Sequence, residues 1–395
     1  MALQPEEVDS DRHFPLKVLF SPAEYRAATR GLEDDLALRI DEMQKRFLHA
    51  SLPTQSFETE EQAEVAIVFE RVNRLGIALD ALQLLTAWTW SEEFDLQEQF
   101  RELAGELEPF GFGDVGQDPN LLLRCCAAVI SGDASPNALV SLSGAVVRQR
   151  FEEIQNGVKG AIDFVRRDLR VETLANLPYS AALVPLAVLF AVPENQQVQM
   201  AGSTRARILK WFWRTCFSRR YSSGVLRSLK TDIAAMVDLR EGSESNLGDF
   251  ATSVEPEFFT ENTFISSVVN TKTFVLMLAQ QDPYSFVSGS PIDLGRVLRE
   301  YNRSEFHHLY PRAYLREDHE SREINRLTNF AFISRSDNQQ LGGVAPSEYR
   351  AVMDADEAEI LGRSLCPPSL FDDDYERFTA ERAELLVATA RGLIA

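Results

Sequence analysis

The chain has 395 residues, of which 45% are hydrophobic and 25% are charged. This balance is typical of folded globular proteins and excludes a chain that is disordered throughout, while the length predicts two or three domains. The 60 Asp and Glu residues outnumber the 40 Lys and Arg residues and give a formal charge of −20. Such a chain cannot bind phosphate over its whole surface, so we expect any nucleic-acid contact to be confined to a local basic region.

Cysteine content and apolar runs predict a reduced cytoplasmic protein outside the membrane. Four cysteines without a C-x-x-C pair argue against a disulfide framework and against a zinc ribbon. The segment Met1–Asp11 is acidic and polar, so we expect no signal peptide. Leu177–Val192 is apolar but has only 16 residues and two prolines, and we interpret it as a buried helix rather than a membrane span.

Helical periodicity dominates residues 20–240. Apolar residues at helical spacing predict a helix over Glu61–Val72 and a second one that Asp80 caps. The same spacing predicts further helices over 121–130, 137–155, 158–168 and 205–217. Gly, Ser, Glu and Pro then cluster over 241–256, which predicts a linker or a long loop. We therefore predict an irregular helical domain over residues 1–250.

Residues 251–395 have a mixed pattern. They predict a helix over 264–280, short β-type runs over 304–309 and 329–334, and an amphipathic helix over 375–394. Asp372, Asp373 and Asp374 precede this last helix, and we interpret them as its solvated start rather than as a metal site. The predicted fold class is mainly α, with an α+β domain in the second region.

Histidines and asparagines gather in that α+β region. His307 and His308 lie at the end of the first predicted strand, and His319 follows within a loop. Asn329 opens the second strand, and Asn338 lies on a short helix that Ser334 can cap. The order of strand, strand and helix with these residues is that of the HNH, or ββα-metal, nuclease core.

The HNH pattern implies a role for each of four residues. His308 matches the general base, which can take a proton from water near neutral pH. His307 and Asn338 match the ligands of one Mg²⁺ (or Mn²⁺) ion, and Asn329 matches the amide that ties the loop between the strands. Two alternatives remain open. Neighbouring residues on a regular strand point to opposite faces, and paired histidines and turn asparagines also occur as plain surface features.

Longer stretches resemble GmrSD-type modification-dependent (type IV) restriction endonucleases. The resemblance to their C-terminal nuclease domain rests on YNRSEFHHLYPRAYL (301–315), INRLTNFAFISRSDN (324–338) and DYERFTAERAELL (374–386). Residues 60–240 are similar to the helical half of the family's other module, through VFERVNRLGIALDALQLL (68–85) and LKWFWRTCFSRRYSS (209–223). The resemblance implies a cytoplasmic DNA endonuclease that acts in phage defence by restricting foreign or modified DNA.

The chain departs from that family at one motif. The other module normally begins with a ParB-like nucleotide-binding domain that carries Asp-Gly-Gln-Gln-Arg, and no such motif occurs here. We therefore predict no nucleotide hydrolysis by this chain alone. Three alternatives stay open: the chain is a C-terminal portion of a longer protein, a partner chain from a split gene supplies the ParB-like domain, or this form has lost nucleotide control.

Basic residues concentrate in two places where DNA can bind. Between residues 205 and 230 there are eight basic residues and no acidic one, and Trp211, Trp213 and Tyr221 are interleaved with them. The predicted nucleic-acid contacts are Arg205, Arg207, Lys210, Arg214, Arg219 and Arg220, together with Arg312 and Arg335 near the histidines. In the alternative interpretation the tryptophans are core residues and the arginines neutralise the acidic remainder.

These patterns predict a metal-dependent DNA endonuclease with a histidine general base. The competing hypothesis is a non-catalytic helical subunit of a defence complex, in which the same fold serves as an interaction or DNA-docking module. The filled HNH positions favour the nuclease, and the missing nucleotide motif and acidic surface favour the docking subunit.

Overall fold

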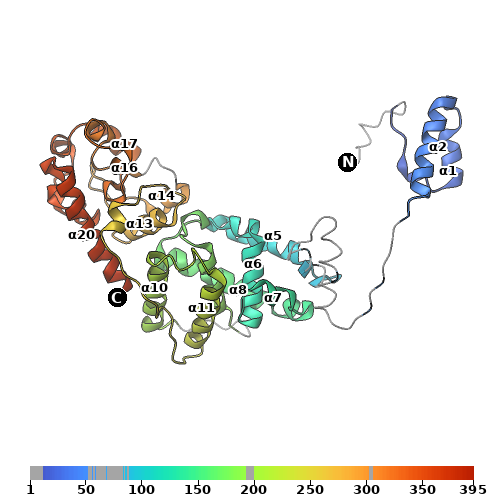
Figure 1. Cartoon of the computed structure of the whole chain (residues 1–395), viewed down its shortest axis with the longest axis horizontal. Coiled ribbons are helices and arrows are strands. Elements are labelled where there is room, and N and C mark those ends of the chain that lie inside the picture. Colours follow the sequence, from blue (N-terminus) through green and yellow to red (C-terminus); the bar gives the residue numbers. More distant parts are fainter. Residues whose placement is uncertain are drawn as a thin grey trace. The chain divides into compact units, whose positions relative to one another are not determined.

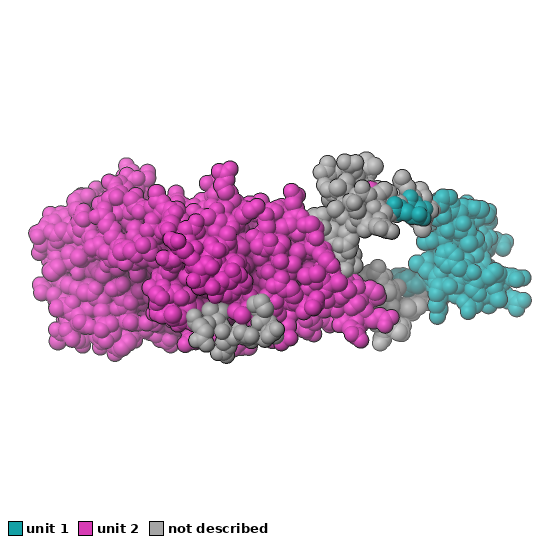
Figure 2. All heavy atoms as spheres, turned by 90° about the horizontal axis from the view of Figure 1, so that it is seen from below, with its two compact units in different colours: residues 1–60 teal, residues 61–395 magenta. Residues whose placement is uncertain are grey.

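The computed structural model describes residues 12–51, 89–192, 200–301 and 306–395, together with isolated residues between 56 and 86. They belong to two compact units, within residues 1–60 and 61–395 (Figures 1 and 2). The helices expected over Glu61–Val72 and after Asp80, most of the family-like phrase 68–85, and Met1–Asp11 lie outside the described residues, as do residues 302–305 at the start of the first expected β run.

The first unit is a small helical hairpin. It consists of a 3₁₀ turn at Leu16–Val18 and the helices α1 (Pro22–Thr29) and α2 (Asp34–Leu48). Leu19, Tyr25 and Ile40 form its core. The Tyr25 hydroxyl donates to Asp41 at 2.6 Å and so joins α1 to α2.

The second unit begins with a helical region that largely follows the predicted pattern. Its helices are α5 (Leu96–Leu107), α6 (Pro119–Ser131), α7 (Pro136–Val140), α8 (Gly144–Leu169), α9 (Leu183–Phe190), α10 (Gly202–Phe217) and α11 (Val225–Arg240). The helix expected over 137–155 is divided between α7 and the first part of α8, and α8 then continues without a break through the helix expected over 158–168. Gly157 lies inside it because α9 packs closely there, and a Cβ at that position would lie 2.5 Å from the Ala187 carbonyl oxygen.

The apolar segment Leu177–Val192 is buried, as predicted, and contains α9. None of the helices in the described part of the chain is both long and apolar enough to cross a membrane. The four cysteines are all buried and unpaired. Burial raises the pKa of the Cys126 thiol to about 12, so this thiol is protonated and unreactive at neutral pH.

The C-terminal region adds short elements and one long helix. Its helices are α12 (Glu257–Thr260), α13 (Val269–Ala279), α14 (Leu294–Glu300), α15 (Arg312–Leu315), α16 (Ser321–Ile324), α17 (Arg335–Leu341), α18 (Pro346–Tyr349), α19 (Glu357–Arg363) and α20 (Tyr375–Ile394). β1 (Phe306–His308) and β2 (Phe330–Phe332) pair antiparallel and form the one sheet of the described residues. The fold is therefore mainly α, as predicted.

Short 3₁₀ turns connect many of these helices. In the second unit they lie at Glu108–Phe110, Gly113–Gln117, Leu174–Asn176, Ser180–Ala182, Leu327–Asn329, Arg350–Val352 and Pro368–Asp372. In Figure 1, α13, α14, α16, α17 and α20 gather at one end of this unit, and α5–α8 lie toward the other.

Two hydrophobic cores organise the second unit. The first core contains Trp211, Phe274, Phe332 and Leu386, and therefore includes residues from both sides of the boundary expected at residues 250 and 251. The second core contains Leu309, Tyr310, Ala331, Leu341 and Phe378 and belongs to the C-terminal region alone. The 241–256 segment lacks regular structure, as predicted, but it packs on the protein because Ser245, Leu247 and Val254 are buried.

The three aspartates before α20 form its solvated start, as predicted. The side chain of Asp374 caps the helix by accepting from the Arg377 amide. Asp373 accepts from the hydroxyl and the amide of Ser347, and Asp372 accepts from the Arg377 guanidinium at 2.9 Å. Further along α20, the Arg382 guanidinium is fully buried and donates to the carbonyls of Thr328, Ser364 and Leu365. α20 thus holds the loop that leads into β2.

Candidate functional site

The β1–β2 hairpin separates the two cores. Phe306 is opposite Phe332, His307 is opposite Ala331, and His308 is opposite Phe330. Phe306, Phe330 and Phe332 belong to the first core, whereas Ala331 belongs to the second. Because side chains alternate along a strand, His308 faces the first core and His307 faces the second. The sequence left open that neighbouring residues of a regular strand point to opposite faces, and the two histidines of the hairpin do so.

His308 is held on one face by packing and by a single hydrogen bond. Its ring lies 4.3 Å from that of Phe330, measured between centroids, and its Nε2 lies 3.0 Å from Oδ1 of Asn325. The Asn325 amide nitrogen in turn donates to the Ser321 carbonyl at 2.6 Å and lies 3.3 Å from the Ser321 hydroxyl. A backbone carbonyl can only accept, so this contact assigns Nδ2 of Asn325 to Ser321 and Oδ1 to the histidine.

The Asn325 contact determines which nitrogen of His308 carries the proton. Oδ1 is an acceptor, so Nε2 must donate to it, and Nδ1 of the neutral ring keeps its lone pair. Burial lowers the pKa of His308 below its ordinary value, and the nearby His307 and Arg312 lower it further, against the opposing effect of the Asn325 bond. The imidazole is therefore neutral at neutral pH, and its Nδ1 makes no hydrogen bond with the described residues.

Asn329 ties together the two chain segments that meet at the hairpin. Its side chain is fully buried. Oδ1 accepts from the Tyr310 amide at 2.8 Å, and Nδ2 donates to the carbonyls of Tyr310 and Ile324 at 3.1 and 3.0 Å. These bonds fix the chain just after β1 against the chain just before β2, and the role that the HNH pattern gives Asn329 stays a prediction.

α17 follows β2 directly and lies on the second-core side. The Ser334 hydroxyl accepts from the Asp337 amide at 3.0 Å and caps the helix, as predicted. Leu341 packs into the second core, and Asn338 lies one turn before it, partly exposed. The Asn338 side chain makes no hydrogen bond among the described residues, so its amide oxygen is available to a ligand. Arg335, in the first turn of α17, is exposed.

The donors on the second-core side fit a hard cation in their chemistry. His307 faces that core, and Asn338 lies on α17, whose Leu341 packs into it. One imidazole and one amide oxygen leave most coordination positions to water or phosphate. The described residues contain no group of three or more His, Cys, Asp and Glu side chains arranged to hold a metal. Among the described residues, His307 and Asn338 are therefore the two side chains that the HNH pattern offers to a cation.

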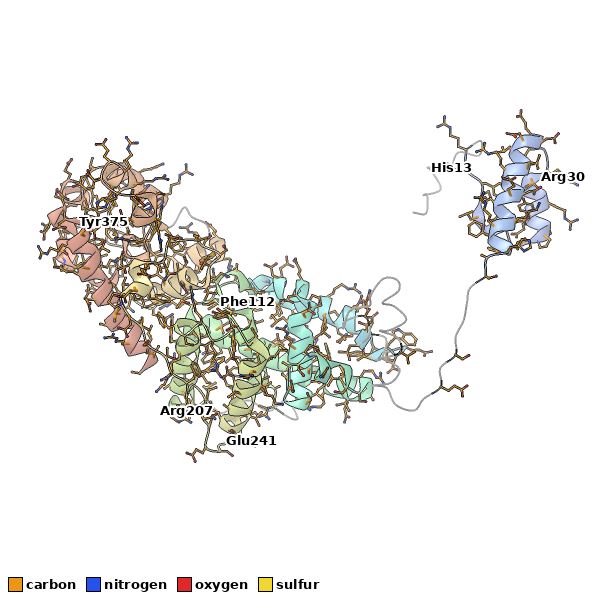
Figure 3. The ribbon with its side chains drawn as sticks, in the orientation of Figure 1. His13, Arg30, Phe112, Arg207, Glu241 and Tyr375 are labelled. Atoms are coloured by element: carbon orange, nitrogen blue, oxygen red, sulfur yellow. The ribbon has the colours of Figure 1, made fainter. Side chains whose placement is uncertain are left out.

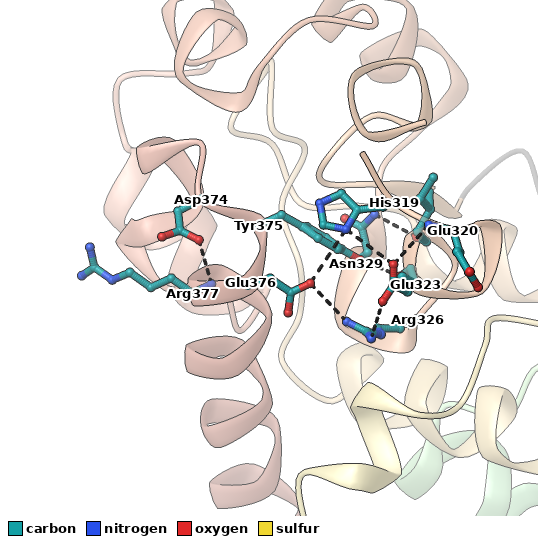
Figure 4. Close-up of polar contacts among 10 residues, drawn as sticks. His319, Glu320, Glu323, Arg326, Asn329, Asp374, Tyr375, Glu376 and Arg377 are labelled. Atoms are coloured by element: carbon teal, nitrogen blue, oxygen red, sulfur yellow. Dashed lines mark hydrogen bonds and ion pairs between the residues drawn. The ribbon is translucent and has the colours of Figure 1, made fainter. Parts of the chain in front are cut away.

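His319 belongs to a separate cluster of charges, drawn in Figure 4. Its Nδ1 lies 3.6 Å from a Glu323 oxygen and 3.8 Å from a Glu376 oxygen, and Arg326 pairs with the same two carboxylates. The Tyr375 ring packs against the histidine, and the Tyr375 hydroxyl donates to the Glu323 carbonyl at 2.7 Å. This cluster fastens the start of α20 to the segment that carries Asn325.

The aromatic residues of the 205–230 segment are core residues. Trp211, Trp213 and Tyr221 are buried. Arg220 forms a two-pronged ion pair with the buried Asp232 at 2.9 and 2.8 Å, and its guanidinium lies 4.0 Å from the centre of the Phe250 ring.

Four other arginines of this segment also have partners within the chain. Arg205 pairs with Asp168, Arg207 donates to the Ser245 carbonyl, Arg214 donates to the Phe250 carbonyl, and Arg219 donates to Asn270. Lys210 is half-buried. Figure 3 labels Arg207 on α10. These contacts favour a structural role for the arginines, and a role in DNA binding stays a prediction for them. By contrast, Arg312 is exposed near His308.

Two residues that hold the site were not singled out from the sequence. Asn325 lies in the phrase INRLTNFAFISRSDN but matches no position of the HNH pattern, and nothing in its spacing distinguishes it from a turn residue. Arg382 had a signal, because it lies four residues from both Phe378 and Leu386 and therefore falls on the buried face of the amphipathic helix. A charged residue at such a position indicates a buried polar contact.

Comparison with known proteins reveals a distant relationship. No protein-family model matches the chain. An uncharacterized protein, MJ0686 of Methanocaldococcus jannaschii, is 21% identical over 381 residues, which cover 87% of this chain and 60% of that protein. The chain thus spans 60% of the length of the relative that it matches. The mainly α fold of this chain, with its two-stranded hairpin, defines its class of structure. The relationship to MJ0686 adds no function.

Proposed function

We propose that the chain is a metal-dependent endonuclease that hydrolyses phosphodiester bonds in DNA, with β1, β2 and α17 as a ββα-metal, HNH-like core. The observation that carries the proposal is the environment of His308. Asn325 holds Nε2 as the donor, and the ring is kept neutral, so Nδ1 has the lone pair that a general base needs. The order of strand, strand and helix and the bonds of Asn329 support the same interpretation.

In the proposed reaction, Nδ1 of His308 takes a proton from the water that attacks the phosphodiester. The burial that lowers the histidine pKa keeps it deprotonated at neutral pH, ready for this step. Arg312 lies exposed nearby and attracts the phosphate group. Asn329 holds the backbone after β1 in place, so that the imidazole does not have to be ordered during the reaction.

His307 and Asn338 are the residues that would hold Mg²⁺ (or Mn²⁺). Such a cation neutralises charge on the phosphate and on the leaving oxygen. His307 and His308 face opposite sides of the hairpin, so the residues that would hold the cation and the proposed base lie on two sides of one strand.

The resemblance to GmrSD-type enzymes implies that the substrate is foreign or modified DNA and that its cleavage serves phage defence. The missing Asp-Gly-Gln-Gln-Arg motif supports a division of labour in which a partner chain with a ParB-like nucleotidase domain regulates cleavage. The chain alone then cleaves without hydrolysing nucleotide.

The competing proposal is a non-catalytic subunit that docks on DNA or on a protein of a defence complex. Two observations favour it: the two histidines face opposite sides of the hairpin, and the described residues contain no cluster of three His, Cys, Asp or Glu metal ligands. The two proposals differ in one measurable property, which is cleavage.

A plasmid-nicking assay decides between them. The purified chain is incubated with supercoiled plasmid, unmodified or with modified bases, in Mg²⁺ or Mn²⁺ and with or without EDTA. The nuclease proposal predicts open-circular or linear DNA with metal and intact plasmid with EDTA. Intact plasmid under every condition, from protein that still binds DNA, supports the docking subunit.

A further inference from the structure

An open groove of about 600 Å³ is lined by α19, by the turn that follows it, and by α20. Most of its lining residues are apolar or small, and they include Leu361, Leu365 and Leu385. Leu385 is 40% exposed, although it lies in the middle of a long helix. A concave apolar surface of this size is typical of a place where another molecule binds.

Leu365 forms part of the groove from an unusual backbone conformation. Its φ is 50°, in the left-handed region that glycine usually occupies just after the end of a helix. The buried Arg382 donates to the Leu365 carbonyl at 3.2 Å and to the Ser364 carbonyl at 3.1 Å, and so holds the turn. The fold thus keeps a leucine where glycine fits more easily, and strained positions of this kind gather at binding sites.

Gly362 also lines the groove, and the fold alone does not account for it. It is the last residue but one of α19, its φ is not left-handed, and a Cβ there would meet no described atom within 4 Å. Glycine is a poor helix former, so the helix itself gains nothing from it. Ala358 lies one turn earlier on the same side of α19. Together these small residues leave room for another backbone to approach α19 closely.

The charged residues that line the groove are acidic. Glu381 and Glu384 lie beside Leu385 on one side of α20, and no basic residue is among the described residues of the lining. Arg377 donates to Glu381 at 2.9 Å, but it is shared with Asp372. Glu384 is exposed and makes no hydrogen bond or ion pair with the described residues. The rim therefore carries negative charge that its neighbours do not neutralise.

We propose that this groove between α19 and α20 binds an amphipathic helix of another protein, one with Lys or Arg beside its apolar face. The walls are helices whose backbone groups are already paired, so an extended segment would find few hydrogen bonds there for its own backbone. A helix pairs its own backbone groups, and its apolar side chains can enter the groove while its basic ones reach Glu381 and Glu384. A second copy of this chain carries −20 and is repelled by the same rim. The proposal does not depend on the nuclease activity.

Synthetic peptides of about 18 residues, long enough to form a helix, test the groove in the full-length chain. One has Leu along one helical face and Lys beside it. The second has Glu in place of each Lys, and the third has the composition of the first in scrambled order. Fluorescence anisotropy gives the dissociation constant of each labelled peptide. We expect the amphipathic Lys peptide to bind at least about tenfold more tightly than the other two, because it alone matches both the apolar groove and its charge.

Two pairs of variants locate the binding. Gly362→Leu fills the groove, and Glu384→Lys reverses the charge of its rim, so each should raise the dissociation constant of the Lys peptide by about tenfold or more. The matched controls are Gly105→Leu on α5, another exposed helical glycine with no described atom within 4 Å of a Cβ, and Glu152→Lys on α8, an exposed glutamate without an ionic partner among the described residues. Both controls should change the constant by less than about twofold.

Urea unfolding separates loss of binding from loss of the fold. We expect Gly362→Leu to be at least as stable as the wild type, because leucine is the better helix former and its Cβ meets no described atom. A Lys peptide that does not bind, or binds no better than its scrambled form, would overturn the proposal. So would equal effects of the groove variants and their controls. A wild type that forms a dimer, which Gly362→Leu abolishes, would assign the groove to a second copy and overturn it as well.

Discussion

Oδ1 of Asn325 lies 3.0 Å from Nε2 of His308, and the amide nitrogen of the same asparagine is bound to the Ser321 carbonyl. This relationship fixes the tautomer of the histidine from a residue 17 positions further along the chain. It links a strand residue to the short helix α16, which the His319 cluster holds against α20. The protonation state of the candidate base is thus a property of the tertiary fold.

Substitutions of Asn325 should show whether this residue positions the proton of His308 or only stabilises the fold. Asn325→Leu removes the acceptor that selects the Nε2–H tautomer, and we expect cleavage to slow by about ten- to a hundredfold at every pH. Asn325→Asp keeps an acceptor but adds a negative charge that stabilises the imidazolium form. The acidic limb of its rate–pH profile should therefore move to higher pH. Wild-type rates and profiles in both variants would show that Asn325 does not act on His308.

The lowered pKa of His308 makes a prediction about stability. The unfolded chain binds a proton at the ordinary histidine pKa of about 6.5, whereas the folded chain binds it only at lower pH. The unfolded state therefore holds more protons in this window, and the free energy of unfolding should fall as the pH drops from about 6.5 toward the folded-state pKa. Urea unfolding at about pH 7.5 and about pH 5.5 should show a smaller loss in His308→Gln than in the wild type. Equal losses in the two proteins would contradict the burial of a neutral His308.

The two asparagines of the motif should behave in opposite ways. Asn329→Ala removes three hydrogen bonds of a fully buried side chain, and we expect the free energy of unfolding to fall by about 2–4 kcal/mol. Asn338→Ala alters a partly exposed side chain without a hydrogen bond, so its cost should be within about 0.5 kcal/mol. Cleavage by the Asn338 variant should instead require a higher metal concentration. Urea unfolding and a Mg²⁺ titration of plasmid cleavage measure the two effects.

Substituting an arginine with a structural partner should lower the stability of the fold, whereas substituting one available to DNA should weaken DNA binding. Arg220→Ala leaves the buried Asp232 without its counter-charge and should lower the free energy of unfolding by about 3–5 kcal/mol. Arg312→Ala should change stability by no more than about 0.5 kcal/mol, but weaken DNA binding and reduce its salt slope by about one. Fluorescence anisotropy with labelled DNA over a salt series tests this. Unchanged affinity in Arg312→Ala would remove that residue from the DNA contact.

Local patterns predicted elements well where capping and periodicity act within a few residues. Neighbouring residues were enough to predict three features. These are the amphipathic pattern of α20 with its start at Asp374, the cap of α17 by Ser334, and the burial of α9. The course of α8 did not, because the sequence predicted a break at residues 156–157, where the helix is continuous; Gly157 there, and Gly160 one turn on, allow α9 to pack closely. The glycines are there for close helix packing.

The candidate site depended more heavily on contacts between distant segments. The HNH pattern singled out His308 and Asn329 as candidates, and strand alternation already raised the opposite orientation of the two histidines. The pattern could not locate Asn325, whose role arises only when α16 folds beside β1. Nor could a count of basic residues reveal that Arg220 neutralises Asp232 and that Arg214 binds the Phe250 carbonyl. Such partners become visible only in the tertiary structure.

The most direct test of the nuclease proposal compares two histidines of the same region. Metal-dependent plasmid cleavage is measured for the wild type, for His308→Ala, and for His319→Ala, which removes one member of the neighbouring charge cluster while Arg326 still bridges Glu323 and Glu376. We predict that His308→Ala lowers the cleavage rate by about 10²- to 10⁴-fold while DNA affinity is kept, and that His319→Ala retains the wild-type rate. A wild-type cleavage rate in His308→Ala would contradict the proposed mechanism.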